Sequence, residues 1–389
     1  MLKNFYRFWM ARNMIRLSSL MFSVYFMWEI VEKFHSILDV SLIPTFSLLG
    51  YFLVIFPEGY VLDKVNRTLI LFFSNFLVLM SYFVLFMIYN LQVIYFVDLL
   101  SSIFSLMSSD AFFAYVKDAV EPSLLTNAIS KVTMGRAISE IFGGILGGVF
   151  AGYFPGYFIY AILTFSLLGT ILSIPQYDTR VRSSKYGYKD VIRVIKPVSL
   201  FLILLTAFNG LFVSIDALGS GFFYYYLHST AIYYTIFILG FSLGSLIGGI
   251  IASKIGKSLE NPTMIVVLLI LVSLSFFWIT IFQDPMIEPF FTASMGVEVS
   301  LADIPLSALL IRVIPNEILG KFNSLTNILT TGASPLMAVV FGTLSTFLKV
   351  TNIFIITGFV MLILSILSYS LFKKALLLKE EDVKKTLDN

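Results

Sequence analysis

Seven carboxylate side chains stand inside long apolar stretches of this 389-residue chain. A carboxylate among apolar residues is costly unless it meets water, a cation or a proton. We therefore expect each of these groups to bind a proton or a polar ligand, or to pair with a basic side chain. They are Glu29, Asp98, Asp110, Glu140, Asp216, Glu298 and Asp303.

Two of these carboxylates lie on stripes of polar and aromatic residues at helical spacing. The first stripe is Ser18, Phe22, Tyr25, Glu29 and Glu32, and the second is Asn209, Val213, Asp216 and Ser220. We predict that Glu29 and Asp216 bind substrate or protons, with Tyr25 and Asn209 beside them. The alternative for Glu29 is a solvated position near the end of its helix.

The other carboxylates allow two interpretations. Glu140 follows Arg136 by four residues, so it either pairs with that arginine or carries a proton. Glu298 and Asp303 are five residues apart, which separates them by about 140° around a helix. They cannot both face one cavity squarely, and both remain candidates for proton coupling. Asp110 is expected to pair with a basic residue.

Other kinds of chemistry are excluded by residues that are missing from the sequence. The chain has no Cys, and its two His stand far apart, at positions 35 and 228, so we expect neither a metal site nor a cofactor. Metalloprotease, serine-hydrolase and phosphate-loop motifs are absent, which argues against an enzyme and against ATP-driven transport. The net charge of +3 is too small to suggest nucleic acid as a partner.

The elements that carry these residues are apolar enough to be membrane helices. Hydrophobic residues make up 58% of the chain and charged residues only 13%, about half the usual share of roughly 25%. Apolar runs of about 20 residues, the length that crosses a bilayer, occur twelve times. The expected spans are 14–36, 41–58, 68–89, 92–115, 127–152, 154–175, 198–226, 230–252, 262–282, 286–312, 322–347 and 350–372. The first is expected to be an uncleaved span.

The distribution of basic residues predicts the orientation. With both termini in the cytoplasm, 24 of the 26 Lys and Arg residues lie inside, and only Lys33 and Lys349 lie outside. Such an excess on one side is the usual sign of the cytoplasmic face. We therefore expect a multi-pass protein of the cell membrane with cytoplasmic N- and C-termini.

The twelve spans divide into two halves that repeat each other. A basic linker at 176–197 separates a bundle of six spans at 1–175 from another at 198–372, and a tail follows at 373–389. The stretch after Gly50 aligns without gaps to the stretch 190 residues later. The identical pairs are Gly50/Gly240, Leu53/Leu243, Gly59/Gly249 and Lys64/Lys254. Repeated six-span halves around a central site are one known transporter architecture.

The turn after the second span resembles the signature of the major facilitator superfamily. The matching residues are Gly59, Asp63, Lys64, Asn66 and Arg67, and the second half has Gly249, Lys254, Gly256 and Lys257, with Ser253 in place of the Asp. The family more often has Gly where this chain has Asn66, and Asn tolerates the left-handed conformation. The resemblance implies an all-α fold of twelve transmembrane helices in two pseudo-symmetric bundles. It also implies that these residues form a conformational latch between transport states.

Two spans carry glycines four residues apart, a spacing that lets helices approach closely. Gly143, Gly144, Gly147 and Gly148 resemble the end of the superfamily's antiporter motif, although Ser130 and Ser139 replace the two glycines expected upstream. The second set is Gly240, Gly244 and Gly248. The resemblance implies packing between the two bundles and favours an exporter, while ordinary helix packing is the alternative.

Together these features predict a secondary transporter that works by alternating access. Basic residues are nearly absent from span middles and the chain has 40 Phe and 20 Tyr, so we expect proton-coupled export of an apolar or cationic compound. An uptake permease and a receptor that no longer transports are the alternatives. The expected partners are the lipid bilayer, a small-molecule substrate and protons, and the expected state is a monomer.

Overall fold

The computed structural model describes residues 2–120, 125–175, 199–314 and, except for 323–324, 327–328 and 331, 322–375. The chain divides into two compact units. The N-terminal unit comprises Met1–Ser183 with Thr230–Thr235, and the C-terminal unit comprises Ser184–Ser229 with Ile236–Asn389. The expected linker at 176–197 lies outside the described residues.

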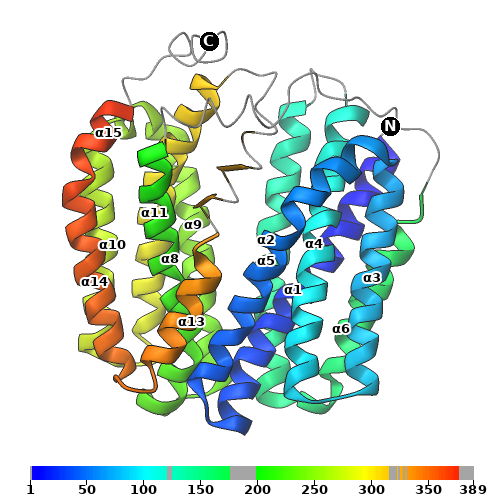
Figure 1. Cartoon of the computed structure of the whole chain (residues 1–389), viewed down its shortest axis with the longest axis horizontal. Coiled ribbons are helices and arrows are strands. Elements are labelled where there is room, and N and C mark those ends of the chain that lie inside the picture. Colours follow the sequence, from blue (N-terminus) through cyan, green and yellow to red (C-terminus); the bar gives the residue numbers. More distant parts are fainter. Residues whose placement is uncertain are drawn as a thin grey trace. The chain divides into compact units, whose positions relative to one another are not determined.

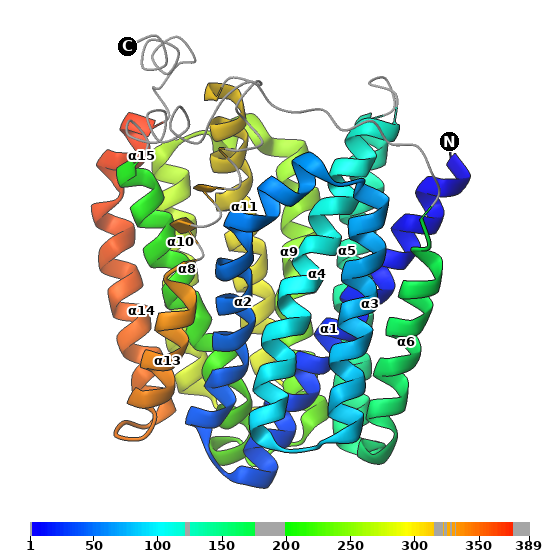
Figure 2. The ribbon, with the colours of Figure 1, turned by 45° about the vertical axis from the view of Figure 1, so that its right-hand side comes forward.

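The N-terminal unit is a bundle of six long helices, shown in blue to green in Figure 1. Helix α1 packs on α5 and α6, and α4 packs on both α2 and α3, which Figure 2 shows side by side. The helices are α1 (Leu2–Phe34), α2 (Ile37–Lys64), α3 (Arg67–Met87), α4 (Leu91–Ala119), α5 (Leu125–Tyr153) and α6 (Phe158–Leu172), with the short 3₁₀ turn η2 (Pro155–Tyr157) before α6.

Polar caps fix where α3 and α4 begin. The side chain of Asn66 accepts a hydrogen bond from Thr68 N at 3.0 Å, and that of Asn90 accepts one from Val93 N at 2.9 Å. Both satisfy backbone donors that a helix start leaves without a partner. Asn66 does not use the left-handed conformation that it would tolerate, since its φ is −58°. Asn66 is there as a helix cap.

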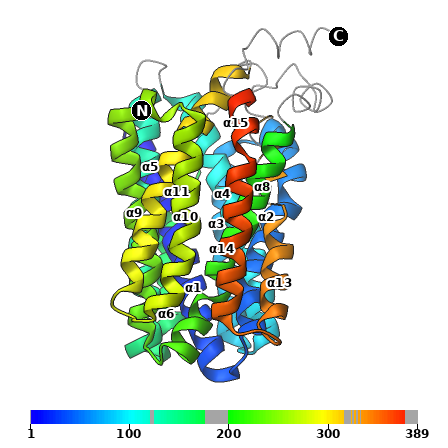
Figure 3. The ribbon, with the colours of Figure 1, turned by 90° about the vertical axis from the view of Figure 1, so that its left-hand side faces the viewer.

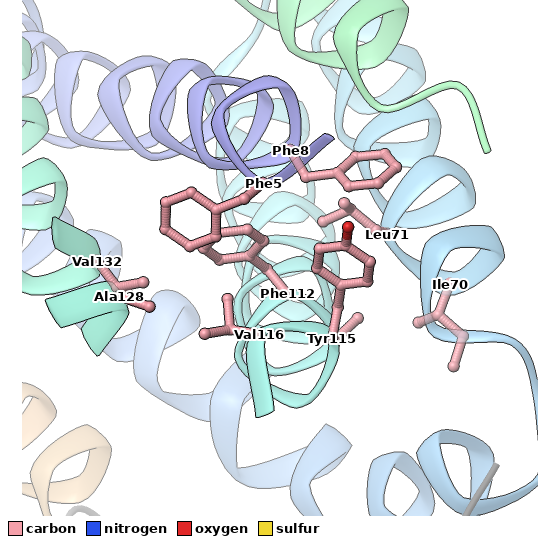
Figure 4. Packing of buried hydrophobic residues seen from close by; sticks show 10 residues of the cluster. Phe5, Phe8, Ile70, Leu71, Phe112, Tyr115, Val116, Ala128 and Val132 are labelled. Atoms are coloured by element: carbon pink, nitrogen blue, oxygen red, sulfur yellow. The ribbon is translucent and has the colours of Figure 1, made fainter. Parts of the chain in front are cut away.

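A hydrophobic core holds the start of α1 against α3, α4 and α5 (Figure 4). Phe8 meets Tyr115 edge to face, with ring centroids 5.0 Å apart, and Phe5 lies 6.0 Å from Phe112. Aromatic pairs at such distances stabilise a core beyond the apolar area they bury. The first two turns of α1, which the sequence placed before the first span, are therefore part of the folded bundle.

The C-terminal unit is a second helical bundle. Helix α14 packs on α10 and α8, as Figure 3 shows, while α11 packs on α10 and α13 on α8. Its helices are α8 (Ser199–Gly221), which continues into the π-turn η4 (Phe222–Tyr226), α9 (Ala231–Leu259) from Ile236 onward, α10 (Pro262–Phe282), α11 (Glu288–Val313), α13 (Ser334–Leu344), α14 (Val350–Leu367) and α15 (Tyr369–Ala375).

Ten helices within the described residues are long and apolar enough to cross a membrane. The two remaining expected spans correspond to α11, which carries Glu298, Asp303 and an internal Pro305, and to a region that includes α13. Part of the expected span at 322–347 lies outside the described residues. The prediction of an all-α membrane fold is confirmed.

The internal repeat extends to the contacts inside each unit. A Cβ on Gly50 would lie 2.8 Å from the carbonyl oxygen of Leu99, where α2 crosses α4. A Cβ on Gly240 would meet the carbonyl oxygen of Pro289, where α9 crosses α11. Both partners in the second contact lie 190 residues after those in the first. The two units therefore repeat a helix contact as well as a sequence pattern.

Candidate functional site

The stripe of α1 that the sequence favoured is buried against neighbouring helices of the N-terminal unit. Phe22 stacks on Tyr82 of α3 with centroids 5.6 Å apart, and Tyr25 stacks on Phe158 of α6 at 3.6 Å. The side chains of Phe22 and Tyr25 are almost completely buried. Helix packing within the N-terminal unit therefore covers this part of the stripe.

Glu29 lies in a hydrogen-bonded cluster where α1 approaches the turn between α3 and α4. It accepts hydrogen bonds from Lys33 at 2.6 Å, from Tyr25 at 3.0 Å and from the hydroxyl of Tyr89. Loss of water around the Tyr89 hydroxyl, and then the carboxylate beside it, raise the pKa of Tyr89, so the hydroxyl stays a donor. Glu29 is the centre of an ion-pair cluster that joins these elements, and it is neither solvated nor without a partner.

The polar face of α1 that remains partly open is one residue further round the helix. Arg12, Arg16, Ser19 and Ser23 follow each other at spacings of four, three and four residues, and the last three are half-buried. Arg12 donates two hydrogen bonds to Ser109 of α4, at 2.9 and 3.3 Å. This face was not among the predicted sites, because Arg12 and Arg16 were counted only among the basic residues of the cytoplasmic side. Their helical spacing with the two serines was the available signal.

Glu140 of α5 is shared by two arginines. Arg136 donates to it at 3.0 Å across one turn of α5, and Arg16 of α1 donates to the same oxygen. The side chains of Arg16 and Glu140 are 25% and 28% exposed, and that of Arg136 is 59% exposed. The pair with Arg136 was one of the two predicted alternatives. The second arginine, from a different helix, turns the pair into a link between α1 and α5.

Asp110 of α4 lies near Glu58 of α2, and the charge of Arg12 acts on it. The basic residue expected beside Asp110 is therefore present as a neighbour, together with a second acid.

Asp98 of α4 is buried at 2% exposure. The one hydrogen bond to its carboxyl group from the described residues comes from Ser47 of α2, which donates at 2.8 Å. No basic side chain contacts the carboxyl group within that part of the chain. Among the described residues Asp98 is thus a buried acid without a counter-ion.

The C-terminal unit holds an acid in the corresponding place. Glu288, the first residue of α11, lies 190 positions after Asp98 and is completely buried. Neither of its carboxyl oxygens has a hydrogen-bond partner among the described residues. Glu288 was not among the predicted site residues, because it stands at the edge of the expected span 286–312. Extending the 190-residue alignment to Asp98 would have found it.

Asp216 and Asn209 share one face of α8. They are seven residues apart, or about two turns, and both are exposed, whereas Ser214, Ile215 and Ala217 beside Asp216 are buried. Asn209 donates to the carbonyl oxygen of Thr330 at 3.4 Å. Asp216 makes no hydrogen bond or ion pair with the described residues. Its role in binding substrate or protons stays a prediction.

Glu298 and Asp303 of α11 have different surroundings. Glu298 is 9% exposed and accepts a hydrogen bond from Ser294 at 2.7 Å, and its second oxygen has no partner among the described residues. Asp303 is exposed. Their coupling roles stay predictions.

The predicted latch is described in part. Arg67 is buried and donates to the carbonyl oxygen of Ala114 in the last turns of α4, at 2.8 Å. Lys64 and Lys254 are exposed, and Gly249 is half-buried. The side chains of Asp63 and Lys257, and the surroundings of Gly59 and Gly256, lie outside what the structure describes. The latch itself therefore remains a prediction.

Five of the seven glycines assigned to packing between bundles pack inside their own unit. Gly143 and Gly147 of α5 face the backbone of α1, where added Cβ atoms would lie 2.8 and 2.9 Å from the carbonyl oxygens of Leu17 and Met21. The remaining three, Gly240, Gly244 and Gly248 of α9, face the backbone of α11. The expected contacts between bundles are wrong for these five, because close approach within a bundle uses the space. For Gly144 and Gly148 the expectation stays a prediction.

Metal ligation finds no support in the described residues, where no three His, Asp or Glu side chains gather closely enough to hold an ion.

Comparisons with known proteins agree with this architecture. Residues 8–328 match the family model described as the Major Facilitator Superfamily. No curated protein matches the chain.

Three solved structures have the same fold. A POT family transporter crystallised with a thioalcohol-conjugated peptide has a TM-score of 0.74 at 14% identity, covering 96% of both chains. A bacterial homologue of the human lysosomal transporter Spinster has a TM-score of 0.70 at 11% identity, covering 96% of this chain and 97% of its own. The nucleoside transporter NupG has 0.68 at 14% identity, covering 94% and 99%. The chain therefore belongs to the Major Facilitator Superfamily, and it is a membrane transporter rather than an enzyme.

Proposed function

We propose that the protein couples the movement of a small organic solute to the movement of protons by alternating access. One observation carries this proposal. Each unit holds a buried carboxyl group without a basic partner in the described part of the chain, Asp98 in one and Glu288 in the other, at positions that the internal repeat makes equivalent.

The physical reason is the cost of a bare charge inside a membrane. An ionised carboxylate without a counter-ion is unfavourable there. Such a carboxyl group keeps its proton while it is buried and releases the proton when water reaches it. Alternating access supplies this change of surroundings, since each site is opened to one side at a time. The equivalence of the two acids supports a shared role in the cycle.

Asp216 is the second candidate for coupling. Its exposed side chain stands on a helix whose neighbouring residues are buried, so it is open to water at mid-span and can meet a solute as well as a proton. Asn209 on the same face adds a polar group for a solute.

For orientation and direction we propose cytoplasmic termini in the cell membrane and export. The orientation rests on the excess of basic residues on one side. The direction rests on the partial antiporter motif that ends in Gly143–Gly148. Uptake and a receptor that no longer transports are the alternatives, and the expected state is a monomer.

The expectation of an apolar or cationic solute now has less support than it had. It rested on the near absence of basic residues from the spans, but Arg12, Arg16 and Arg136 all lie on α1 and α5 inside the N-terminal unit. Aromatic residues remain abundant, so the solute is proposed to have an apolar part.

Proteoliposomes that contain the pH dye pyranine test the proposal. The purified protein is exposed to tetraphenylphosphonium as the cationic probe and benzoate as the anionic one, with and without a pH gradient. Benzoic acid crosses a bilayer unaided, so protein-free liposomes give the background. We expect one probe to change the internal pH beyond this background, and Asp98→Asn together with Glu288→Gln to abolish the difference. Glu32→Gln, which neutralises an exposed acid at the end of α1, is the matched control. Probe uptake that ignores both the gradient and the double substitution would refute proton coupling.

A further inference from the structure

The half-buried face of α1 and the facing side of α5 gather three guanidinium groups around one carboxylate. Arg16 and Arg136 both donate to Glu140, and Arg12 stands one helical turn before Arg16 on the same face of α1. We call Arg12, Arg16, Arg136 and Glu140 the arginine cluster.

Acceptors are shared at this cluster. Arg16 and Arg136 both donate to one oxygen of Glu140, and Arg12 donates to the neutral hydroxyl of Ser109. One carboxylate therefore serves two guanidinium groups. A bound oxyanion would supply the acceptors that the cluster lacks.

Donors in the cluster also lack partners. Arg12 is 7% exposed and uses Nε and Nη2 to reach Ser109, and its Nη1 has no acceptor among the described residues. The Nε of Arg16 likewise has none. A buried donor without an acceptor is costly, and a guanidinium donor more so because it is charged. Each of these nitrogens can still donate to an acceptor that the described residues do not provide.

The cluster faces away from lipid. On α5 the large exposed hydrophobic side chains lie within an arc of about 100°, calculated at 100° per residue. Arg136 and Glu140 lie on the opposite side of the helix, roughly 150° and 190° from the middle of that arc. The exposed side chains are Met134, Ile138, Phe142, Ile145 and Tyr153. A lipid headgroup would approach from their side, whereas a solute inside the unit would reach the arginines.

We propose that the arginine cluster is a binding subsite for an oxyanion, the carboxylate or phosphate of the transported organic solute. The guanidinium fork matches both groups, and charge-assisted hydrogen bonds from it are among the strongest in proteins. Glu140 occupies the arginines in the absence of solute, and the solute competes with it for them. This inference deepens the proposed transport function and rests on it, because the oxyanion is part of a transported solute only if the protein transports one.

Binding measured without any gradient tests the subsite. The full-length protein, purified in a neutral detergent, is titrated calorimetrically with sodium benzoate and with sodium phosphate, and sodium chloride at equal ionic strength is the reference. We expect Arg16→Gln to weaken binding of the oxyanion about tenfold or more, the effect of losing one charge-assisted hydrogen bond. Glu140→Gln should strengthen it by about tenfold, because both arginines lose their competing partner.

Arg7→Gln is the matched control, since Arg7 is on the same helix and donates to the carbonyl oxygen of Ile174 instead. If Arg16→Gln does not fold, the gain expected for Glu140→Gln still decides the question. A purely structural ion pair predicts loss of stability in Glu140→Gln with no gain in affinity, and that result would overturn the proposal. Repeating the titration in micelles with phosphatidylglycerol identifies the source of the oxyanion. Binding of phosphatidylglycerol with no response to benzoate or phosphate would also overturn it.

The outcome is independent of proton coupling. Oxyanion binding without any pH-dependent flux would refute the proposed coupling and leave the subsite intact. Proton-linked flux of tetraphenylphosphonium without oxyanion binding would refute the subsite and leave the proposed coupling intact.

Discussion

The contact between α9 and α11 predicts that replacing Gly244, even by alanine, lowers the stability of the folded protein. A Cβ at this position would lie 2.7 Å from the carbonyl carbon of Ala293 and 2.9 Å from its Cα, and closer still to its oxygen. All three are backbone atoms, so no side chain can rotate away. Ordinary carbon contacts are about 3.5–4.0 Å, so the two helices would have to separate.

The magnitude follows from two opposing effects. Overpacking a tight contact costs typically about 1–3 kcal/mol, and separation would also weaken the bond between Ser245 and Ser300, whose hydroxyl oxygens are 2.6 Å apart. Replacing glycine by alanine inside a helix returns roughly 1 kcal/mol. We expect Gly244→Ala to be destabilising overall, because the misfit includes backbone atoms at several points of the contact.

Thermal unfolding in detergent, followed by tryptophan fluorescence, measures the effect. Gly249→Ala on the same helix is the control, since nothing lies within 4 Å of its added Cβ and only the helical gain should appear. A lower midpoint for Gly244→Ala with an equal or higher midpoint for Gly249→Ala is the expected result. Equal midpoints in the two variants would refute the close approach of α9 and α11.

Three further predictions concern the polar groups. Arg67→Ala removes the donor to the end of α4 and should lower transport while the protein still folds, and wild-type flux of the transported probe would contradict the latch. Asp98→Asn and Glu288→Gln, made singly, should each shift or flatten the pH profile of transport, measured as flux between pH 5 and 8. Profiles identical to wild type would remove both acids from the coupling path. Glu29→Gln weakens the ion-pair cluster and should lower the stability of the N-terminal unit by about 1–2 kcal/mol, judged by thermal unfolding, because the partner Lys33 is half in water.

Hydropathy and charge were sufficient to predict the membrane fold. Length and apolarity of the spans follow from bilayer thickness, which acts on each segment separately and so can be read from local sequence. The repeat was also visible, since Gly50 and Gly240 occupy equivalent contacts. The spans depend on local sequence, and the repeat depends on the comparison of a segment with the segment 190 positions later.

The polar site was harder to predict because it depends on contacts between helices. Helical spacing identifies a polar stripe, but it does not say which neighbour covers it. The stripe with Glu29 is covered by α3 and α6, and the one with Arg16, 100° further round, stays partly open. Likewise, the sequence shows Arg12 only as one of the basic residues of the cytoplasmic side. Its hydrogen bond to Ser109 of α4 appears only in the structure.

The early start of α1 has a practical consequence for anyone shortening the protein. Trimming the polar residues ahead of the first apolar run would remove Phe5 and Phe8 from the core and Arg12 from its contact with α4. A shortened version of the protein should therefore keep the residues from Phe5 to Arg12, because they belong to the folded N-terminal unit.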